Sequence, residues 1–97
     1  MLLSDGPHNV KIAPLATTFN VGDQVICSSD GHPPTSIHWQ NVDTERKMEG
    51  AILVIDKTFI NKESKWKCVA TNLLTKIFSE NNITFYVYDN GRASVNV

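Results

Sequence analysis

The chain has 97 residues, of which 41% are hydrophobic and 20% charged, and its formal net charge at pH 7 is −1. This length suits one domain, and this composition is that of a globular chain rather than a disordered one. A net charge near zero cannot neutralise many phosphates. Binding to nucleic acid and direct contact with an anionic membrane therefore both lack electrostatic support.

The N-terminal stretch 1–7 reads MLLSDGP, which is too short for a secretory signal. No run of about eighteen apolar residues occurs, so no segment is predicted to span a membrane. We expect Met1 to be an expression start and the natural precursor to extend further; the alternative is a complete cytosolic protein. Residues 1–5 are interpreted as a tail or expression remnant, 6–89 as the domain, and 90–97 as a C-terminal tail or inter-domain linker.

Turn-forming residues punctuate the chain, and the segments between them are rich in Val, Ile, Thr, Phe, Trp and Tyr, which favour strands. The turn signals lie at 6–7, 13–14, 20–23, 30–34, 61–64 and 89–91. No stretch keeps a helical period for more than about two turns. Short strands at close spacing predict an all-β sandwich or barrel.

Alternation along the strands predicts which side chains are buried. The apolar positions that share a face are Ile37 and Trp39, then Trp66, Cys68 and Ala70, then Ile83, Phe85 and Val87. Lys67 and Thr71 face the other way, and Asn82, Thr84 and Tyr86 form the polar set of the last strand. An antiparallel sheet packed on a second sheet has one solvent-exposed face and one buried face. Residues 51–55 are apolar on both faces, which predicts a central strand.

The two cysteines, Cys27 and Cys68, lie far apart in the chain. A four-ligand metal site would need further ligands, which His8, His32 or His38 could supply, but no Cys-x-x-Cys or His-x-x-x-His spacing occurs. The pair is better explained as one disulfide, which implies an oxidising compartment. We expect no metal and no other cofactor.

Trp39 follows Cys27 by twelve residues, and Cys68 closes the pattern. Further characteristic segments are 22–27 (GDQVIC), 32–39 (HPPTSIHW), 53–55 (LVI) and 66–72 (WKCVATN). On these residues the chain resembles the immunoglobulin superfamily, in particular I-set and related adhesion-receptor domains. The resemblance implies an immunoglobulin-like antiparallel β-sandwich of about seven strands, with one inter-sheet disulfide and Trp39 packed against it.

The chain departs from the family's pattern before its second cysteine. The family usually has Asp-x-Gly-x-Tyr-x-Cys before its second cysteine, whereas this chain has Lys62 in place of the acid and Trp66 in place of the tyrosine. Trp66 has no hydroxyl, so the usual tyrosine corner cannot form and the indole N–H needs another acceptor. The gap between Trp39 and Leu53 leaves no space for two extra strands, which disfavours an antibody-like variable domain.

An enzymatic function has little support. Ser28, Ser29, Asp30 and His32 lie in one loop and could be taken for a catalytic triad. No glycine elbow or second acidic residue accompanies them, and such residues are common in loops because they form turns. We expect a protein that is not an enzyme.

Asn82-Ile83-Thr84 is an N-glycosylation sequon. Alternation places Asn82 on the solvent face, and the cysteine pair already favours a secretory route. We therefore expect glycosylation at Asn82; the alternative is an ordinary exposed strand asparagine.

Two surfaces are candidates for contact with another protein. The turn of the last hairpin carries the apolar residues Leu73, Leu74, Ile77 and Phe78, where the family usually has Gly, Ser and Ala. Exposed apolar residues at a loop tip often mark a contact, although Leu73 and Phe78 could instead fold over the end of the sandwich. The second surface, which the resemblance implies, is the outward sheet face with His38, Gln40, Lys67 and Tyr86. A glycan on Asn82 would share that face and oppose a flat contact there.

The resemblance implies an extracellular protein-binding module of a secreted or cell-surface adhesion or immune-type receptor. Its partner would be a protein ligand or a second copy, and further domains would flank it. The alternative is a structural spacer in a tandem immunoglobulin array, either extracellular or of the intracellular muscle-protein type. The cysteine pair and Asn82 favour an extracellular location.

Overall fold

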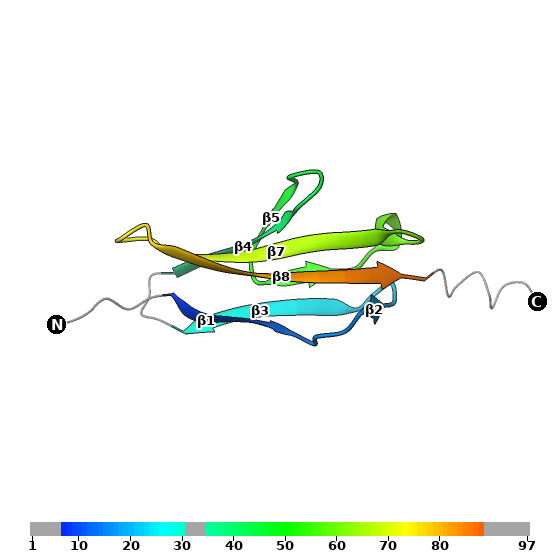
Figure 1. Ribbon diagram of the computed structural model, residues 1–97, viewed down its shortest axis with the longest axis horizontal. Coiled ribbons are helices and arrows are strands. Elements are labelled where there is room, and N and C mark those ends of the chain that lie inside the picture. Colours follow the sequence, from blue (N-terminus) through cyan, green and yellow to red (C-terminus); the bar gives the residue numbers. More distant parts are fainter. Residues whose placement is uncertain (1–6, 31–34, 89–97) are drawn as a thin grey trace, which may run out of the picture.

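The computed structural model describes residues 7–30 and 35–88, and these form an all-β fold of two facing sheets (Figure 1). The strands are β1 (His8–Ala13), β2 (Thr18–Phe19), β3 (Gln24–Asp30), β4 (Thr35–Asn41), β5 (Lys47–Glu49), β6 (Ile52–Val54), β7 (Glu63–Asn72) and β8 (Phe78–Val87), with one 3-10 turn, η1 (Lys57–Phe59). The tails assigned to 1–5 and 90–97 and the loop segment 31–34, which includes His32, lie outside the described residues.

One sheet has the order β1-β3-β6 and the other the order β2-β8-β7-β4-β5. The sequence predicts about seven strands, whereas the described residues form eight. The additional strand arises because the first edge segment divides: β1 pairs with β3, and after Pro14, which has no N–H to donate, the chain crosses to pair as β2 with β8. The larger sheet curls, and β5 stands away from the rest of the fold (Figure 1).

The predicted disulfide forms between Cys27 on β3 and Cys68 on β7, with a Cα–Cα distance of 6.4 Å. It joins the two sheets near the middle of the fold. Trp39 lies opposite Cys68 in the β4–β7 pairing and is fully buried. Its indole Nε1 donates a hydrogen bond of 2.9 Å to the Ala51 carbonyl, so the core tryptophan has no unpaired polar atom.

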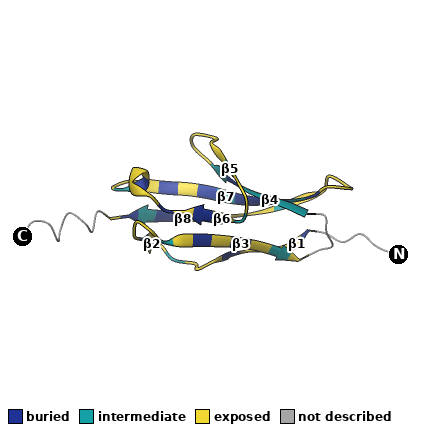
Figure 2. Cartoon of the chain, turned by 180° about the vertical axis from the view of Figure 1, so that it is seen from behind, coloured by how far each residue is buried: buried dark blue, intermediate teal, exposed yellow. Residues whose placement is uncertain are grey.

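The buried positions follow the predicted alternation in β7 and β8. Ile83, Phe85 and Val87 all face the core, while Asn82 and Thr84 are exposed. Buried and exposed segments alternate along β7 in Figure 2. The central strand predicted over residues 51–55 is wrong. Strand β6 lies at an edge of the smaller sheet, and the outer face of that sheet is not covered within the described part of the chain. Leu53 and Ile55 are therefore buried, whereas Ile52 and Val54 remain exposed.

Side chains of β8 connect the start of the chain to the larger sheet. Ser79 Oγ donates to the Pro7 carbonyl at 3.0 Å, and Asn81 Nδ2 donates to the Val10 carbonyl at 2.9 Å. The Asn81 Oδ1 atom accepts from the backbone N–H of Asn82 at 2.9 Å. One amide side chain thus links β8 to β1, whose backbone pairs with β3 in the opposite sheet.

Trp66 belongs to an aromatic stack. Its ring lies 5.8 Å from that of Phe59 at an interplanar angle of 26°, and Phe59 in turn stacks on Phe85. The indole Nε1 of Trp66 is buried and finds no acceptor among the described residues. Ring packing therefore holds Trp66 in the core, with its N–H donor left unpaired in the described part of the chain.

Removing the disulfide should reduce stability substantially. Because the two cysteines are 41 residues apart, the double substitution Cys27→Ala/Cys68→Ala should lower the free energy of unfolding by about 4 kcal/mol in the chain-entropy model. Urea denaturation of both proteins measures this change. Thiol alkylation followed by mass spectrometry is the control: two reactive thiols in the oxidised wild-type protein would contradict the bridge.

The two buried tryptophans form a matched pair for measuring how the unpaired N–H of Trp66 affects the free energy of unfolding. Trp39→Phe and Trp66→Phe delete the same atoms, but only the first breaks a hydrogen bond, after which the Ala51 carbonyl keeps the backbone N–H of Cys27 as its donor. We expect Trp39→Phe to cost about 0.5–1.5 kcal/mol more unfolding free energy than Trp66→Phe. Urea denaturation gives both values. An equal cost, or a larger one at Trp66, would mean that the Trp66 N–H is satisfied in solution.

Candidate protein-contact surface

The turn between β7 and β8 is organised by the buried side chain of Asn72. Its Oδ1 atom accepts hydrogen bonds from the backbone N–H groups of Leu74 at 2.8 Å and Thr75 at 3.1 Å. Lys76 then adopts a left-handed conformation with φ of 66°, and its N–H donates to the Asn72 carbonyl. These bonds fix the turn, so the side chains at its tip are held by a defined backbone.

Four large apolar side chains at this tip are open to solvent. The exposed fractions are 45% for Leu73, 77% for Leu74, 53% for Ile77 and 59% for Phe78. Leu73 and Phe78 therefore do not fold over the end of the sandwich. Four adjacent exposed apolar residues are more than the scattered single ones that a monomer surface normally carries. We call these four residues the hairpin tip.

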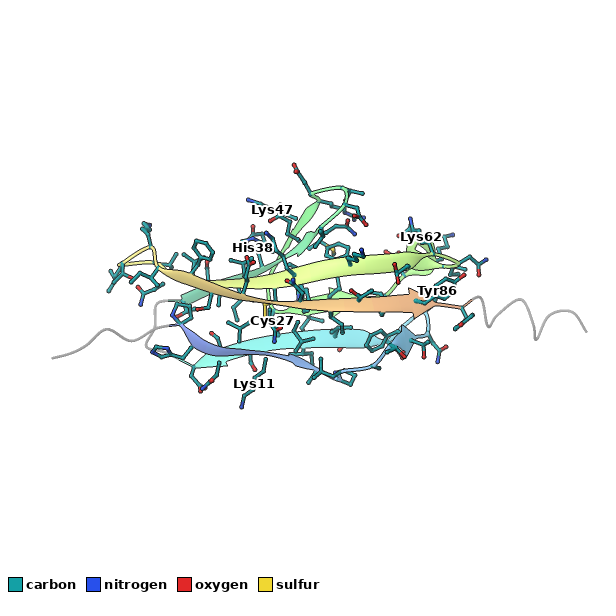
Figure 3. The ribbon with its side chains drawn as sticks, viewed as in Figure 1. Lys11, Cys27, His38, Lys47, Lys62 and Tyr86 are labelled. Carbon is teal, nitrogen blue, oxygen red and sulfur yellow. A yellow bond between two sulfur atoms is a disulfide. The ribbon has the colours of Figure 1, made fainter. Side chains whose placement is uncertain are left out.

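A shallow hollow of about 240 Å³ lies on the outer face of the larger sheet, next to the hairpin tip. Its lining residues are His38, Gln40, Lys47, Lys67, Val69, Thr71, Phe78 and Glu80. Three predicted contact residues of this face, His38, Gln40 and Lys67, thus lie together. Tyr86 does not join them, because it pairs with Glu63 near the opposite end of the sheet and its ring lies 4.6 Å from that of Tyr88 (Figure 3).

Phe78 belongs to both surfaces, since it ends the hairpin tip and also lines the hollow. Val69, which is 8% exposed, forms an apolar floor beside it. Charged groups stand around this floor, and Lys67 Nζ lies 3.7 Å from Glu80 Oε1. An apolar centre with a polar rim is the arrangement of protein–protein interfaces. Val69 is not among the residues predicted for this face, although the alternation that places Lys67 and Thr71 outward places Val69 there too.

Asn82 is exposed and pairs with Lys67 across the β7–β8 ladder. It also lines an open hollow of about 620 Å³ with Leu15, Thr18 and Thr84, at the margin where the first segment crosses to β2. Asn82 therefore stands between the outer sheet face and its edge. A glycan attached there would lie beside Lys67 and away from the hairpin tip.

No protein-family model matches the sequence, and no curated protein is found to be related to it. Within residues 7–30 and 35–88, no group of three or more His, Cys, Asp or Glu side chains could hold a metal ion. The helical structure in this same part of the chain is too short to cross a membrane. The disulfide indicates an oxidising environment.

The sequon can be tested with its neighbouring asparagine as control. When the domain passes through the secretory pathway of a glycosylating host, we expect one N-glycan, whose mass a peptide-N-glycosidase removes. Asn82→Gln should abolish the glycan, whereas Asn81→Gln should keep it, because Asn81 is followed by Asn82 and Ile83 and begins no sequon. Intact-mass spectrometry reports both results. A wild-type protein without any glycan would contradict the assignment.

Proposed function

We propose that this chain is an immunoglobulin-like extracellular domain that binds another protein through the hairpin tip and the adjoining outer face of the larger sheet. The proposed role is recognition, without catalysis. The observation that carries the proposal is the exposure of Leu73, Leu74, Ile77 and Phe78 on a turn with a defined backbone. The partner is either a protein ligand on another molecule or a second copy of this chain.

The strand order supports the immunoglobulin part of the proposal. In the family's nomenclature β1, β3 and β6 correspond to strands A, B and E, and β4, β7 and β8 to C, F and G. The disulfide then joins B to F, and the buried tryptophan lies on C, as in that family. The gap between Trp39 and Leu53 holds a single short strand, β5, rather than two.

The size of the surface supports a contact that combines the tip with the sheet face. Burying one large apolar side chain contributes about 1.5–3 kcal/mol, so a few tip residues can supply most of the energy of a moderate interaction. A stable interface buries on the order of 1,200–2,000 Å² in total, which is more than four side chains provide. The neighbouring hollow around Val69 and Phe78 offers the additional area.

A spacer role is the second candidate. Strand β1 begins at one end of the fold and β8 ends at the other (Figure 1). This arrangement lets neighbouring domains follow one another end to end in a tandem array, and it requires no ligand. A spacer does not, however, account for the exposed apolar tip.

A pair of equally exposed leucines tests the proposed contact. Leu74 is 77% exposed at the hairpin tip, and Leu15 is 75% exposed beside β2. Binding is first sought by screening the domain against cell-surface proteins and by sedimentation for self-association. Leu74→Asp should then weaken the interaction at least roughly tenfold, because a charge enters an apolar contact, whereas Leu15→Asp should leave it unchanged.

Three results would contradict this assignment of the contact. If Leu15→Asp weakens binding as much as Leu74→Asp, the tip is not the site. If Leu74→Asp has no effect while Asn82→Gln strengthens binding, the sheet face beside Asn82 is the contact and a glycan restricts it. If the domain binds neither a partner nor itself, the spacer role is favoured.

A further inference from the structure

A second hollow, of about 230 Å³, lies away from the hairpin tip, between the β4–β5 turn, η1 and the start of β7. Its lining residues are Asn41, Thr44, Arg46, Thr58, Phe59, Lys62, Ser64 and Trp66. Lys62 marks this region in Figure 3, far from the left-hand turn that carries the hairpin tip. None of these residues belongs to the contact surface proposed above.

One wall is the β4–β5 turn, which is held by the side chain of Asn41. The Asn41 Oδ1 atom accepts from the backbone N–H groups of Asp43 and Thr44, both at 2.9 Å. Glu45 adopts a left-handed conformation with φ of 65°, and the Arg46 carbonyl then accepts from the Asn41 N–H. This closed turn fixes the backbone from which Arg46 extends.

The opposite wall is η1 and the turn that follows it. Asp56 caps η1 by accepting from the backbone N–H of Thr58 at 2.9 Å and from its hydroxyl. Asn61 then turns the chain with φ of 63°, so that Lys62 and Ser64 enter the hollow from the start of β7.

The inner part of the hollow is aromatic. Phe59 and Trp66 are both buried and stack on each other, so the small part of each ring that reaches the hollow is apolar. A dry cavity of about 150 Å³ is large enough to hold benzene. A hollow of about 230 Å³ therefore has room for one ring and a small polar group.

The outer part of the hollow is cationic. Arg46 and Lys62 line it, and none of the lining residues is acidic. Asp56 lies within electrostatic reach of Arg46. Hydrogen bonds from Thr58 hold the pKa of Asp56 below its ordinary value, with smaller contributions from the charges of Arg46 and Lys57, so this carboxylate is ionised at neutral pH. It offsets only part of the positive charge of Arg46 and Lys62.

We infer that this hollow binds an aromatic carboxylate, with the ring against Phe59 and Trp66 and the carboxylate between Arg46 and Lys62. A guanidinium matches the two oxygens of a carboxylate, and an ammonium adds a second charge-assisted contact. A free aromatic acid and a peptide ending in a C-terminal aromatic residue both have this chemistry. The inference does not depend on the function of the hairpin tip.

Trp66 also provides a way to observe binding. Its indole N–H is closed to solvent and lacks an acceptor in the described part of the chain, whereas that of Trp39 is bonded to Ala51. The two indole signals in a ¹H–¹⁵N spectrum therefore report on the hollow and on a neighbouring core position that does not line it. Trp66→Phe assigns them by removing one signal.

The experiment titrates the ¹⁵N-labelled domain with sodium phenylacetate and, separately, with its neutral analogue 2-phenylethanol. We expect the Trp66 indole signal to shift saturably with phenylacetate, with a Kd on the order of 1 mM, while the Trp39 signal stays in place. The double variant Arg46→Gln/Lys62→Gln should raise this Kd roughly tenfold or more. Lys47→Gln, on the same hairpin but lining the other hollow, should leave it unchanged.

A peptide with a C-terminal phenylalanine, compared with its C-terminal amide, distinguishes the two sources. If this peptide displaces phenylacetate and binds more tightly, the ligand is a peptide C-terminus. If it does not displace phenylacetate, the ligand is a free aromatic acid. Either result supports the carboxylate site. The inference is overturned if phenylacetate causes no Trp66 shift, if 2-phenylethanol or the amidated peptide binds equally well, or if Lys47→Gln weakens binding as much as the double variant.

Discussion

The covalent link between Cys27 and Cys68, with Trp39 beside it, is the constraint on which the rest of this structure depends. Cys68 pairs with Trp39 in the larger sheet and is bonded to Cys27 in the smaller one, so one cluster connects three strands and both layers. A chain of this length buries too little apolar surface for large stability on its own. A cross-sheet bond that restricts the unfolded chain therefore matters more here than it would in a larger domain.

The long β7–β8 hairpin, which the disulfide joins to the smaller sheet, carries residues of both candidate sites. Strand β7 carries Cys68 of the disulfide and pairs with β4 from Trp66 to Asn72, so the pairing reaches residues of both sites. One end closes in the turn organised by Asn72 and presents the hairpin tip. Near the other end Trp66 stacks on Phe59 and forms the aromatic part of the cationic hollow. The hairpin tip and the aromatic–cationic hollow thus lie toward opposite ends of one hairpin.

Trp66 has a physical consequence at the second of these sites. Where immunoglobulin domains have a tyrosine, its hydroxyl bonds back to the chain and closes a corner. In this chain, the larger indole stacks on Phe59, leaves its own N–H without an acceptor in the described residues, and lies next to a hollow lined by Arg46 and Lys62. The unpaired indole N–H and the candidate ligand site therefore coincide.

The sequence by itself determined the features that depend on residue type and local period. The separated cysteines predict the disulfide, and the alternation in residues 83–87 predicts the buried side of β8, because a strand turns successive side chains to opposite faces whatever its neighbours are. Only the tertiary structure decided which strands are neighbours. It placed β6 at an edge, so that Ile52 and Val54 stay exposed, and it brought Val69 beside Phe78. It also brought Arg46, in the β4–β5 turn, next to Phe59 of η1 and to Lys62. Strand β6 separates Arg46 from these two residues in the chain. No local pattern encodes such juxtapositions, since they arise from the order in which strands pair across the two sheets.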